Sequence, residues 1–118
     1  MRADLKDIER KRGDVWLQVL KVDLANIQAE YGHFRTQAAL QLPKHVKDSI
    51  EVDVMRSFNS MQVLTHQNLS NILKGYAMFN PQLNYCQGMN FMAGYLFLSL
   101  GHREEMAFAV MRETIERF

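Results

Sequence analysis

The sequence predicts an all-α fold, and three observations support this class. Apolar residues recur at spacings of three and four along most of the 118 residues, as they do on one face of a helix. No stretch alternates strictly between apolar and polar residues, and no turn sequence typical of a β-hairpin is present. The chain also lacks internal repeats, low-complexity tracts and linkers. Together with its modest length, this predicts a single domain, or part of one, with one core.

The first predicted helical stretch covers residues 4–29 and is interrupted at Gly13. Its apolar positions are Leu5, Ile8, Val15, Trp16, Val19, Leu20, Leu24 and Ile27. Trp16 is the only tryptophan, and its default place is the core. Residues 31–33 (Tyr-Gly-His) are predicted to stop the helix. Residues 34–42 would then form a short helix or an irregular connection.

The next helix is expected to open at Pro43, because proline can begin a helix but cannot continue one. Its predicted apolar stripe consists of Ile50, Val54 and Met55. Asp53 and Arg56 lie three residues apart, on neighbouring positions of the helix surface. The turn-like residues 57–60 should end this helix directly after the arginine.

Residues 64–80 carry the clearest amphipathic pattern of the chain. The predicted buried positions are Leu69, Ile72, Leu73, Tyr76 and Ala77. The pair Asn80-Pro81 is expected to close this helix, because the residue before a proline disfavours the helical conformation. After a loop at 82–87, residues 88–100 are apolar on nearly every side. This helix is therefore predicted to be the buried centre of the domain.

Residues 103–118 form the last predicted helix, after a break at Gly101-His102. Its first turn contains Glu104 and Glu105, whose charges favour the N-terminal end of a helix dipole. Its predicted apolar positions are Met106, Ala107, Val110 and Met111.

Charge and composition exclude several functional classes. Fourteen Lys and Arg against thirteen Asp and Glu give a net charge of +1, so no long-range field attracts nucleic acid or an anionic membrane. The longest apolar run, residues 88–100, is too short to span a bilayer, and the N-terminus lacks the apolar segment of a signal peptide. A single cysteine excludes an internal disulfide and fits a reducing compartment. We therefore expect a cytoplasmic protein that neither binds nucleic acid nor inserts into a membrane.

The inventory of reactive groups is short. The chain has no phosphate-binding G-x-x-x-x-G-K-[ST] loop, and its four histidines have no metal-ligand spacing with one another or with Cys86. Cys86 is interpreted as a buried structural thiol rather than a nucleophile. No metal or cofactor is expected to bind the chain itself.

Two polar residues, Arg56 and Gln87, have no evident structural purpose. Gln87-Gly88 precedes an apolar helix that Ser or Asp would cap better, which suggests an amide presented to a partner. The simpler interpretation is a surface glutamine beside a turn glycine. In the same way, Asp53 and Arg56 alone would be an ordinary exposed helix pair, contributing roughly a few tenths of a kcal/mol.

Taken together, these two segments resemble a known family. Residues 50–56 read I-x-x-D-x-x-R and residues 85–88 read Y-x-Q-G, which resembles the paired motifs of the TBC family, the all-helical GTPase-activating domains for Rab GTPases. Residues 12–16 are similar to the R-x-x-V-W segment near the start of that domain. Residues 85–98 follow its Y-C-Q-G-M-N-F-hydrophobic-A-G-Y-L pattern, whereas Ser57 stands where threonine is usual. The family's domain continues beyond position 118. The resemblance therefore implies that 1–118 is the N-terminal portion of one irregular multi-helix TBC domain, truncated at its C-terminal side.

The resemblance also implies a role for each residue of the two motifs. Arg56 would be an arginine finger and Gln87 a glutamine finger, both supplied in trans to a GTP-bound Rab to accelerate GTP hydrolysis. Asp53 would hold the guanidinium of Arg56 in its working direction, while Tyr85 and Gly88 would shape the loop that carries Gln87. GTP and Mg²⁺ would be carried by the partner, so the chain would act on another protein's active site rather than on a substrate pocket of its own. Its work would lie in vesicle trafficking, where the Rab could recruit it to endomembranes.

Two alternatives remain at this stage. A catalytically silent module of the same fold could bind a GTPase or a scaffold without activating hydrolysis. An unrelated helical interaction protein is the other alternative. The presence of both Arg56 and Gln87 favours the activating domain, because charge stabilisation and water positioning are the two tasks that GTP hydrolysis requires.

Overall fold

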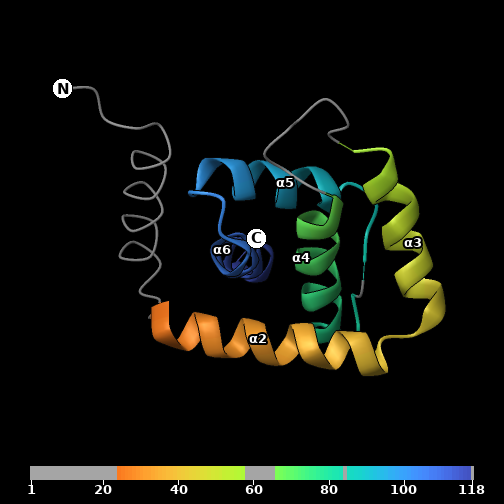
Figure 1. Cartoon of the computed structure of the whole chain (residues 1–118), viewed down its shortest axis with the longest axis horizontal. Coiled ribbons are helices and arrows are strands. Elements are labelled where there is room, and N and C mark those ends of the chain that lie inside the picture. The colour runs from red at the N-terminus through yellow and green to blue at the C-terminus, as the bar shows by residue number, and fades with distance from the viewer. Residues whose placement is uncertain (1–23, 58–65, 84, 118) are drawn as a thin grey trace.

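The computed structural model describes residues 24–57, 66–83 and 85–117, which contain five α-helices (Figure 1). These are α2 (Leu24–Gln41), α3 (Lys44–Met55), α4 (His66–Phe79), α5 (Met89–Ser99) and α6 (Glu104–Arg117). Within these three ranges no residue lies in a strand, and the all-α prediction is confirmed. The predicted break at Gly13 and the predicted core position of Trp16 lie outside the described residues.

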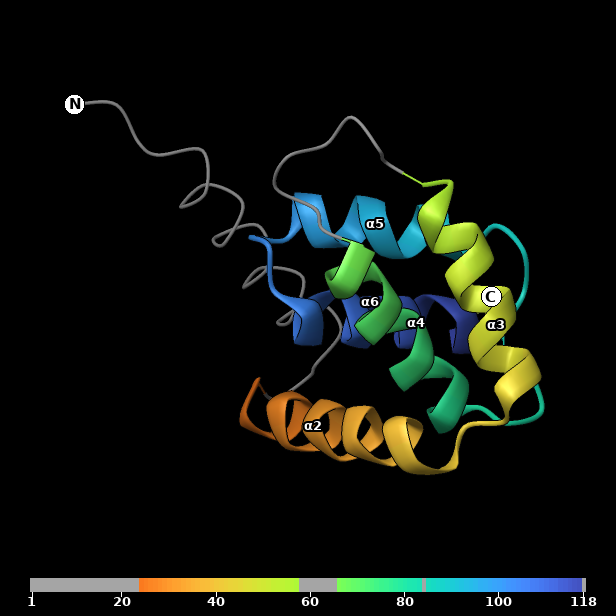
Figure 2. The ribbon, with the colours of Figure 1, turned by 45° about the vertical axis from the view of Figure 1, so that its right-hand side comes forward.

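The central helix of the fold is α4, which packs against each of α2, α3, α5 and α6. In both ribbon views, α4 and α6 lie between α2 on one side and α5 on the other, with α3 at one end (Figures 1 and 2). The buried hydrophobic residues of α4 are Leu69, Ile72, Leu73, Tyr76 and Ala77. These are the positions that the helical period of the sequence predicts. The clearest amphipathic segment therefore forms the core.

The predicted helix stop at residues 31–33 is wrong, because α2 continues through Gly32 to Gln41. The reason lies in packing against the rest of the fold. Tyr31 contacts Phe108 of α6, with ring centroids 5.3 Å apart, and Phe34 contacts Phe79 of α4 at the same centroid distance. These contacts lie on both sides of the glycine along one face of the helix. Tertiary packing thus outweighs the weak helix propensity of Gly32.

We expect Gly32→Ala to stabilise the protein by about 0.5–1 kcal/mol, because alanine loses less backbone entropy than glycine in a helix interior. A Cβ built at Gly32 meets no atom within 4 Å. The control is Gly75→Ala in α4, where the new Cβ would lie 3.3 Å from Cε1 of the buried Tyr31 ring and should destabilise the fold. Urea denaturation of both variants measures the difference. A loss of stability in Gly32→Ala would contradict the continuous α2 helix.

The prediction that residues 88–100 form the buried centre is also wrong. In α5 the side chains of Phe91 and Tyr95 are 61% and 66% exposed. Its buried residues are Met89, Asn90, Ala93, Gly94 and Phe97. An apolar sequence shows that a helix can be buried, but it does not show how many other helices pack around it. In this fold the described neighbours cover only one face of α5.

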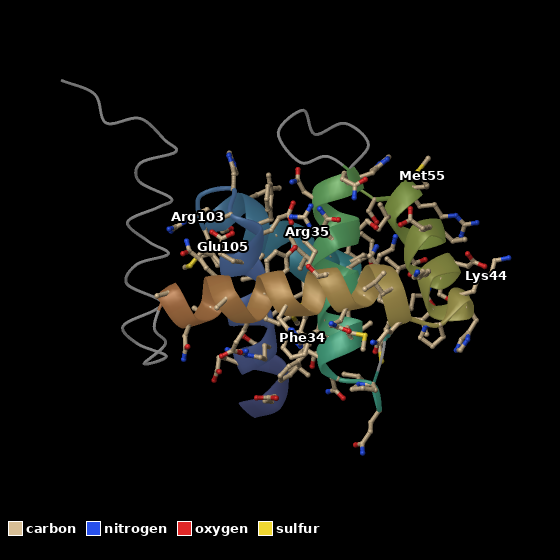
Figure 3. The ribbon with its side chains drawn as sticks, turned by 60° about the horizontal axis from the view of Figure 1, so that its bottom comes forward. Phe34, Arg35, Lys44, Met55, Arg103 and Glu105 are labelled. Atoms are coloured by element: carbon tan, nitrogen blue, oxygen red, sulfur yellow. The ribbon has the colours of Figure 1, made fainter. Side chains whose placement is uncertain are left out.

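Met55 does not belong to the buried stripe of α3, contrary to the sequence prediction. Its side chain is 59% exposed, and Figure 3 shows it at the end of α3, pointing away from the other helices. The buried residues of α3 are Val46, Ile50 and Val54, spaced by four. The helix does start after Pro43, which occupies the N-cap position, so that part of the prediction is confirmed.

Glu104, at the start of α6, joins three helices through its carboxylate. It accepts hydrogen bonds from the Tyr31 hydroxyl of α2 (2.6 Å) and from the Asn68 and Asn71 amides of α4 (2.7 and 3.3 Å). Burial and the hydrogen bond to this carboxylate raise the pKa of Tyr31, which keeps its hydroxyl a donor. Glu104 and Glu105 both lie in the first turn, as predicted.

Candidate functional site

Arg56 and Gln87 come together at the surface between α3 and α5. Arg56 is the C-cap residue of α3, where its backbone N–H bonds to the Asp53 carbonyl, and its side chain is exposed. Gln87 is exposed in the turn that precedes α5. Both side chains line one pocket of about 140 Å³, together with Asp53, Ser57, Asn90 and Phe91. The fold thus gathers the two polar residues that the sequence left unexplained.

A larger pocket of about 480 Å³ adjoins this one and shares two of its lining residues. It is lined by Asp48, Ser49, Val52, Asp53, Tyr85 and Gln87. Asp53 and Gln87 therefore lie between the two pockets, and the side chain of Gln87 borders both. An amide in this position can donate and accept hydrogen bonds toward a partner seated over either pocket.

The carboxylate of Asp53 is held by Tyr85 rather than by Arg56. The Tyr85 hydroxyl donates to Oδ2 of Asp53 at 2.5 Å. Within the described part of the chain, no ion pair joins Asp53 to Arg56, although the sequence pattern suggested one. Burial and the hydrogen bond to Asp53 raise the pKa of Tyr85, so the hydroxyl remains a protonated donor over the working pH range. This bond joins the loop before α5 to the last turn of α3.

A second connection between the same two elements runs through Ser57 and Asn90. The Ser57 hydroxyl donates to the backbone carbonyl of Asp53 at 2.5 Å, and Nδ2 of Asn90 donates to the Ser57 hydroxyl oxygen at 2.6 Å. Sequence reasoning assigned no role to either residue. The available signal was Asn90 itself, a polar residue within the apolar run of residues 88–100. The two connections fix the end of α3 relative to the start of α5.

Gly88 adopts a backbone conformation that other residues avoid. It is the N-cap of α5 with φ of +102° and ψ of −21°. A Cβ at this position would meet no atom within 4 Å, so the backbone angle rather than a close contact requires glycine. The turn places Gln87 directly beside the first turn of α5.

Gly88→Ala should therefore destabilise the protein by about 1–2 kcal/mol, the cost of a left-handed conformation for a residue with a Cβ. Urea denaturation measures this loss. The same substitution at Gly32, which should raise stability, serves as the matched control for the change in side chain. An unchanged free energy of unfolding in Gly88→Ala would contradict the positive φ.

Cys86 is exposed, so the prediction of a buried structural thiol is wrong. It lies in the loop between α4 and α5, where its backbone N–H bonds to the sulfur of Met89 at 3.2 Å. Loops run over the surface, because their backbone groups need partners or water. The prediction rested on the general tendency of free cysteines to be buried, and the position of Cys86 in a surface loop outweighs that tendency here.

The described residues offer no evident place for a metal ion, since no three of their His, Cys, Asp and Glu side chains gather suitably. None of the five helices is long and apolar enough to cross a membrane. The chemistry that the pocket can offer rests on its cation, its amides and its carboxylate.

Comparison with known proteins identifies relatives across most of the chain. The profile of the Rab-GTPase-TBC domain family matches residues 9–118. The chain is 35% identical to Growth hormone-regulated TBC protein 1 of Xenopus laevis over 115 residues, covering 90% of the chain and 33% of that protein. It is 31% identical to TBC1 domain family member 2B of Xenopus tropicalis, covering 100% of the chain and 13% of that protein. Identity to the GTPase-activating protein GYP5 of Eremothecium gossypii is 26%, over 91% of the chain and 12% of that protein.

The chain therefore spans a third or less of the length of these relatives. No solved structure gives a significant match to it.

Proposed function

This chain belongs to the Rab-GTPase-TBC domain family, and from that premise we propose that it supplies the catalytic side chains of a Rab GTPase-activating protein. The observation that carries the proposal is the shared pocket of Arg56 and Gln87. The two side chains come from different segments, both are exposed, and both face the same hollow at the surface. A protein that completes another protein's active site needs its reactive groups displayed in this way.

The chemistry of GTP hydrolysis explains why these two residue types belong together. Charge spreads over the transferring phosphoryl group in the transition state, and the attacking water must be oriented. The guanidinium of Arg56 keeps its charge and offers several donors in a planar fork, which suits the first task. The carboxamide of Gln87 both donates and accepts, which suits the second. In this proposal, Arg56 is the arginine finger and Gln87 the glutamine finger.

The remaining predicted site residues have supporting roles in this proposal. Tyr85 holds Asp53 through the 2.5 Å hydrogen bond, and this fixes the loop of Gln87 against the helix of Arg56. Gly88 supplies the positive φ that turns the chain into α5 directly after Gln87. Asp53 thus acts on the geometry of both segments, rather than only on the guanidinium of Arg56.

Exposed apolar side chains around the site offer a surface on which a partner can dock. Within the described ranges, the exposed large hydrophobic residues of α3 and α5 are Val52, Met55, Phe91 and Tyr95. Val52 lines the larger pocket and Phe91 the smaller one, so this apolar surface is continuous with the two fingers. Aromatic residues surrounded by polar groups are typical of protein interfaces. The partner we propose is a Rab in its GTP-bound state, which brings its own GTP and Mg²⁺.

The decisive test is a hydrolysis assay on a panel of GTP-loaded Rab proteins, with the full-length protein present in catalytic amounts. We expect accelerated phosphate release with at least one Rab, through many turnovers. The matched control is the same protein carrying Arg56→Ala and Gln87→Ala, which should bind the same Rab without accelerating release. Wild-type binding to a GTP-bound Rab without acceleration would identify a silent binding module instead. Absence of both binding and acceleration across the panel would overturn the proposal.

A further inference from the structure

Asn90 is a buried polar residue with one atom left unsatisfied. The residue is 4% exposed, and its Nδ2 donates to Ser57 at 2.6 Å. Its Oδ1 is buried and has no hydrogen-bond partner among the described residues. A buried acceptor without a partner is unfavourable, so such an atom in a native protein calls for an explanation.

The orientation of the Asn90 amide follows from its neighbours. The Ser57 hydroxyl uses its single proton to donate to the carbonyl of Asp53. Its oxygen is therefore an acceptor toward α5, and only the NH₂ end of Asn90 can bond to it. The carbonyl end must then point elsewhere. Asn90 lines the 140 Å³ pocket that Arg56 and Gln87 also line.

We propose that Asn90 is a positioning residue whose Oδ1 accepts a hydrogen bond from the guanidinium of Arg56 when a GTPase is engaged. This inference rests on the proposed function, since it concerns the same pocket. This hydrogen bond uses one N–H group of the guanidinium, on the side that faces Asn90. The remaining N–H groups stay available for the phosphate oxygens of the GTP. Asn90 thereby orients Arg56.

Arg56 is the better match for this acceptor than Gln87. A hydrogen bond from a charged donor is about twice as strong as a neutral one, and the guanidinium has five N–H groups to share between two acceptors. Asp53, the charged acceptor in the pocket, has its Oδ2 engaged by Tyr85, and no ion pair joins it to Arg56 within the described part of the chain. The Gln87 amide, by contrast, is a neutral donor and borders the larger pocket as well.

The first experiment replaces Asn90 by leucine, which has the same number of side-chain heavy atoms and the same branching but no polar atoms. In the full-length protein, with a Rab that the wild type activates, Asn90→Leu should lower kcat by about 10-fold to 100-fold, the usual effect of losing a hydrogen bond to a charged group. KM should change less than threefold, because the bond forms when the guanidinium meets the transferring phosphoryl group. The melting temperature should change little, because the loss of the hydrogen bond to Ser57 is offset by the removal of a buried unsatisfied acceptor.

Ser57→Ala is the matched control for a merely structural role. It removes the hydrogen bond between Asn90 and Ser57, and with it one connection between α3 and α5, but it keeps the Oδ1 acceptor of Asn90. We expect its kcat to fall less than that of Asn90→Leu. If both variants lose kcat equally, Asn90 acts only as a structural connection and the inference is overturned.

The second experiment separates Arg56 from Gln87 by double-mutant cycles. The measured quantity is the affinity for the Rab bound to GDP and aluminium fluoride, a mimic of the transferring phosphoryl group. The affinity loss caused by Asn90→Leu should vanish in an Arg56→Ala background and persist in a Gln87→Ala background. Persistence in the Arg56→Ala background overturns the inference while leaving the proposed function intact. If the wild type activates no Rab, the proposed function fails, and this inference fails with it.

Discussion

Arg56→Lys is expected to abolish acceleration of GTP hydrolysis while leaving the helix content and the melting temperature unchanged. Lysine keeps the positive charge but presents a compact ammonium in place of a planar fork, so it cannot bridge phosphate oxygens in the same geometry. An arginine finger in GTPases is worth about 10³–10⁵ in rate. This corresponds to about 4–7 kcal/mol of transition-state stabilisation. Single-turnover hydrolysis with a responsive Rab measures the loss.

The matched control for this change is Arg35→Lys on α2. Arg35 is also exposed, and it lines neither of the two pockets at the candidate site. Its replacement should leave the rate of hydrolysis as it is in the wild type. Near-normal acceleration by the Arg56→Lys variant would contradict the arginine finger.

Gln87→Ala should lower the rate of the hydrolytic step by about 10²–10³, comparable with the loss of one preorganised hydrogen-bond group at a transition state. The affinity for the GTP-bound Rab should change little, because the amide acts mainly on the attacking water. Single-turnover kinetics and equilibrium titration with a slowly hydrolysed GTP analogue measure the two quantities separately. Gln82→Ala, an exposed glutamine in the same loop, is the control and should have no effect.

A second arm of this experiment uses a Rab whose own switch glutamine is replaced by leucine. If Gln87 positions the water, the wild-type protein should still activate that Rab, whereas the Gln87→Ala variant should not. If the wild-type protein does not activate this Rab variant, the switch glutamine of the Rab, and not Gln87, positions the attacking water.

The sequence predicts the residues of the site better than it predicts their contacts. The helical period and the turn-like residues after it predicted Arg56 at the end of a helix, where the structure has it. Gly88 predicted a turn at Gln87 before the next helix, and this too agrees with the structure. The hydrogen bond between Tyr85 and Asp53 joins residues that are 32 positions apart in the sequence. A local sequence pattern cannot predict whether the carboxylate of Asp53 bonds to Tyr85 or to Arg56. The orphan Oδ1 of Asn90 likewise appears only when burial is known in three dimensions.

The fold shows the same division between local and tertiary information. The amphipathic pattern of α4 fixes a buried face without reference to other helices, and its five predicted core residues are all buried. Gly32 and α5 depend on tertiary neighbours instead. Phe79 and Phe108 hold α2 helical across the glycine, and one face of α5 has no described helix against it. Propensity and hydrophobicity do not contain this information.

The helix that carries Arg56 buries only three side chains, and we therefore expect the site to have a local folding equilibrium of its own. Only Val46, Ile50 and Val54 of α3 are buried, and they pack mainly against α4. Transient detachment of α3 would separate Asp53 from Tyr85 and disassemble the site, while α2, α4 and α6 remain folded. Backbone amides of α3 should therefore exchange with solvent faster than those of α4. A GTPase that binds only the assembled site would slow that exchange, and part of its binding energy would be used to hold α3 in place.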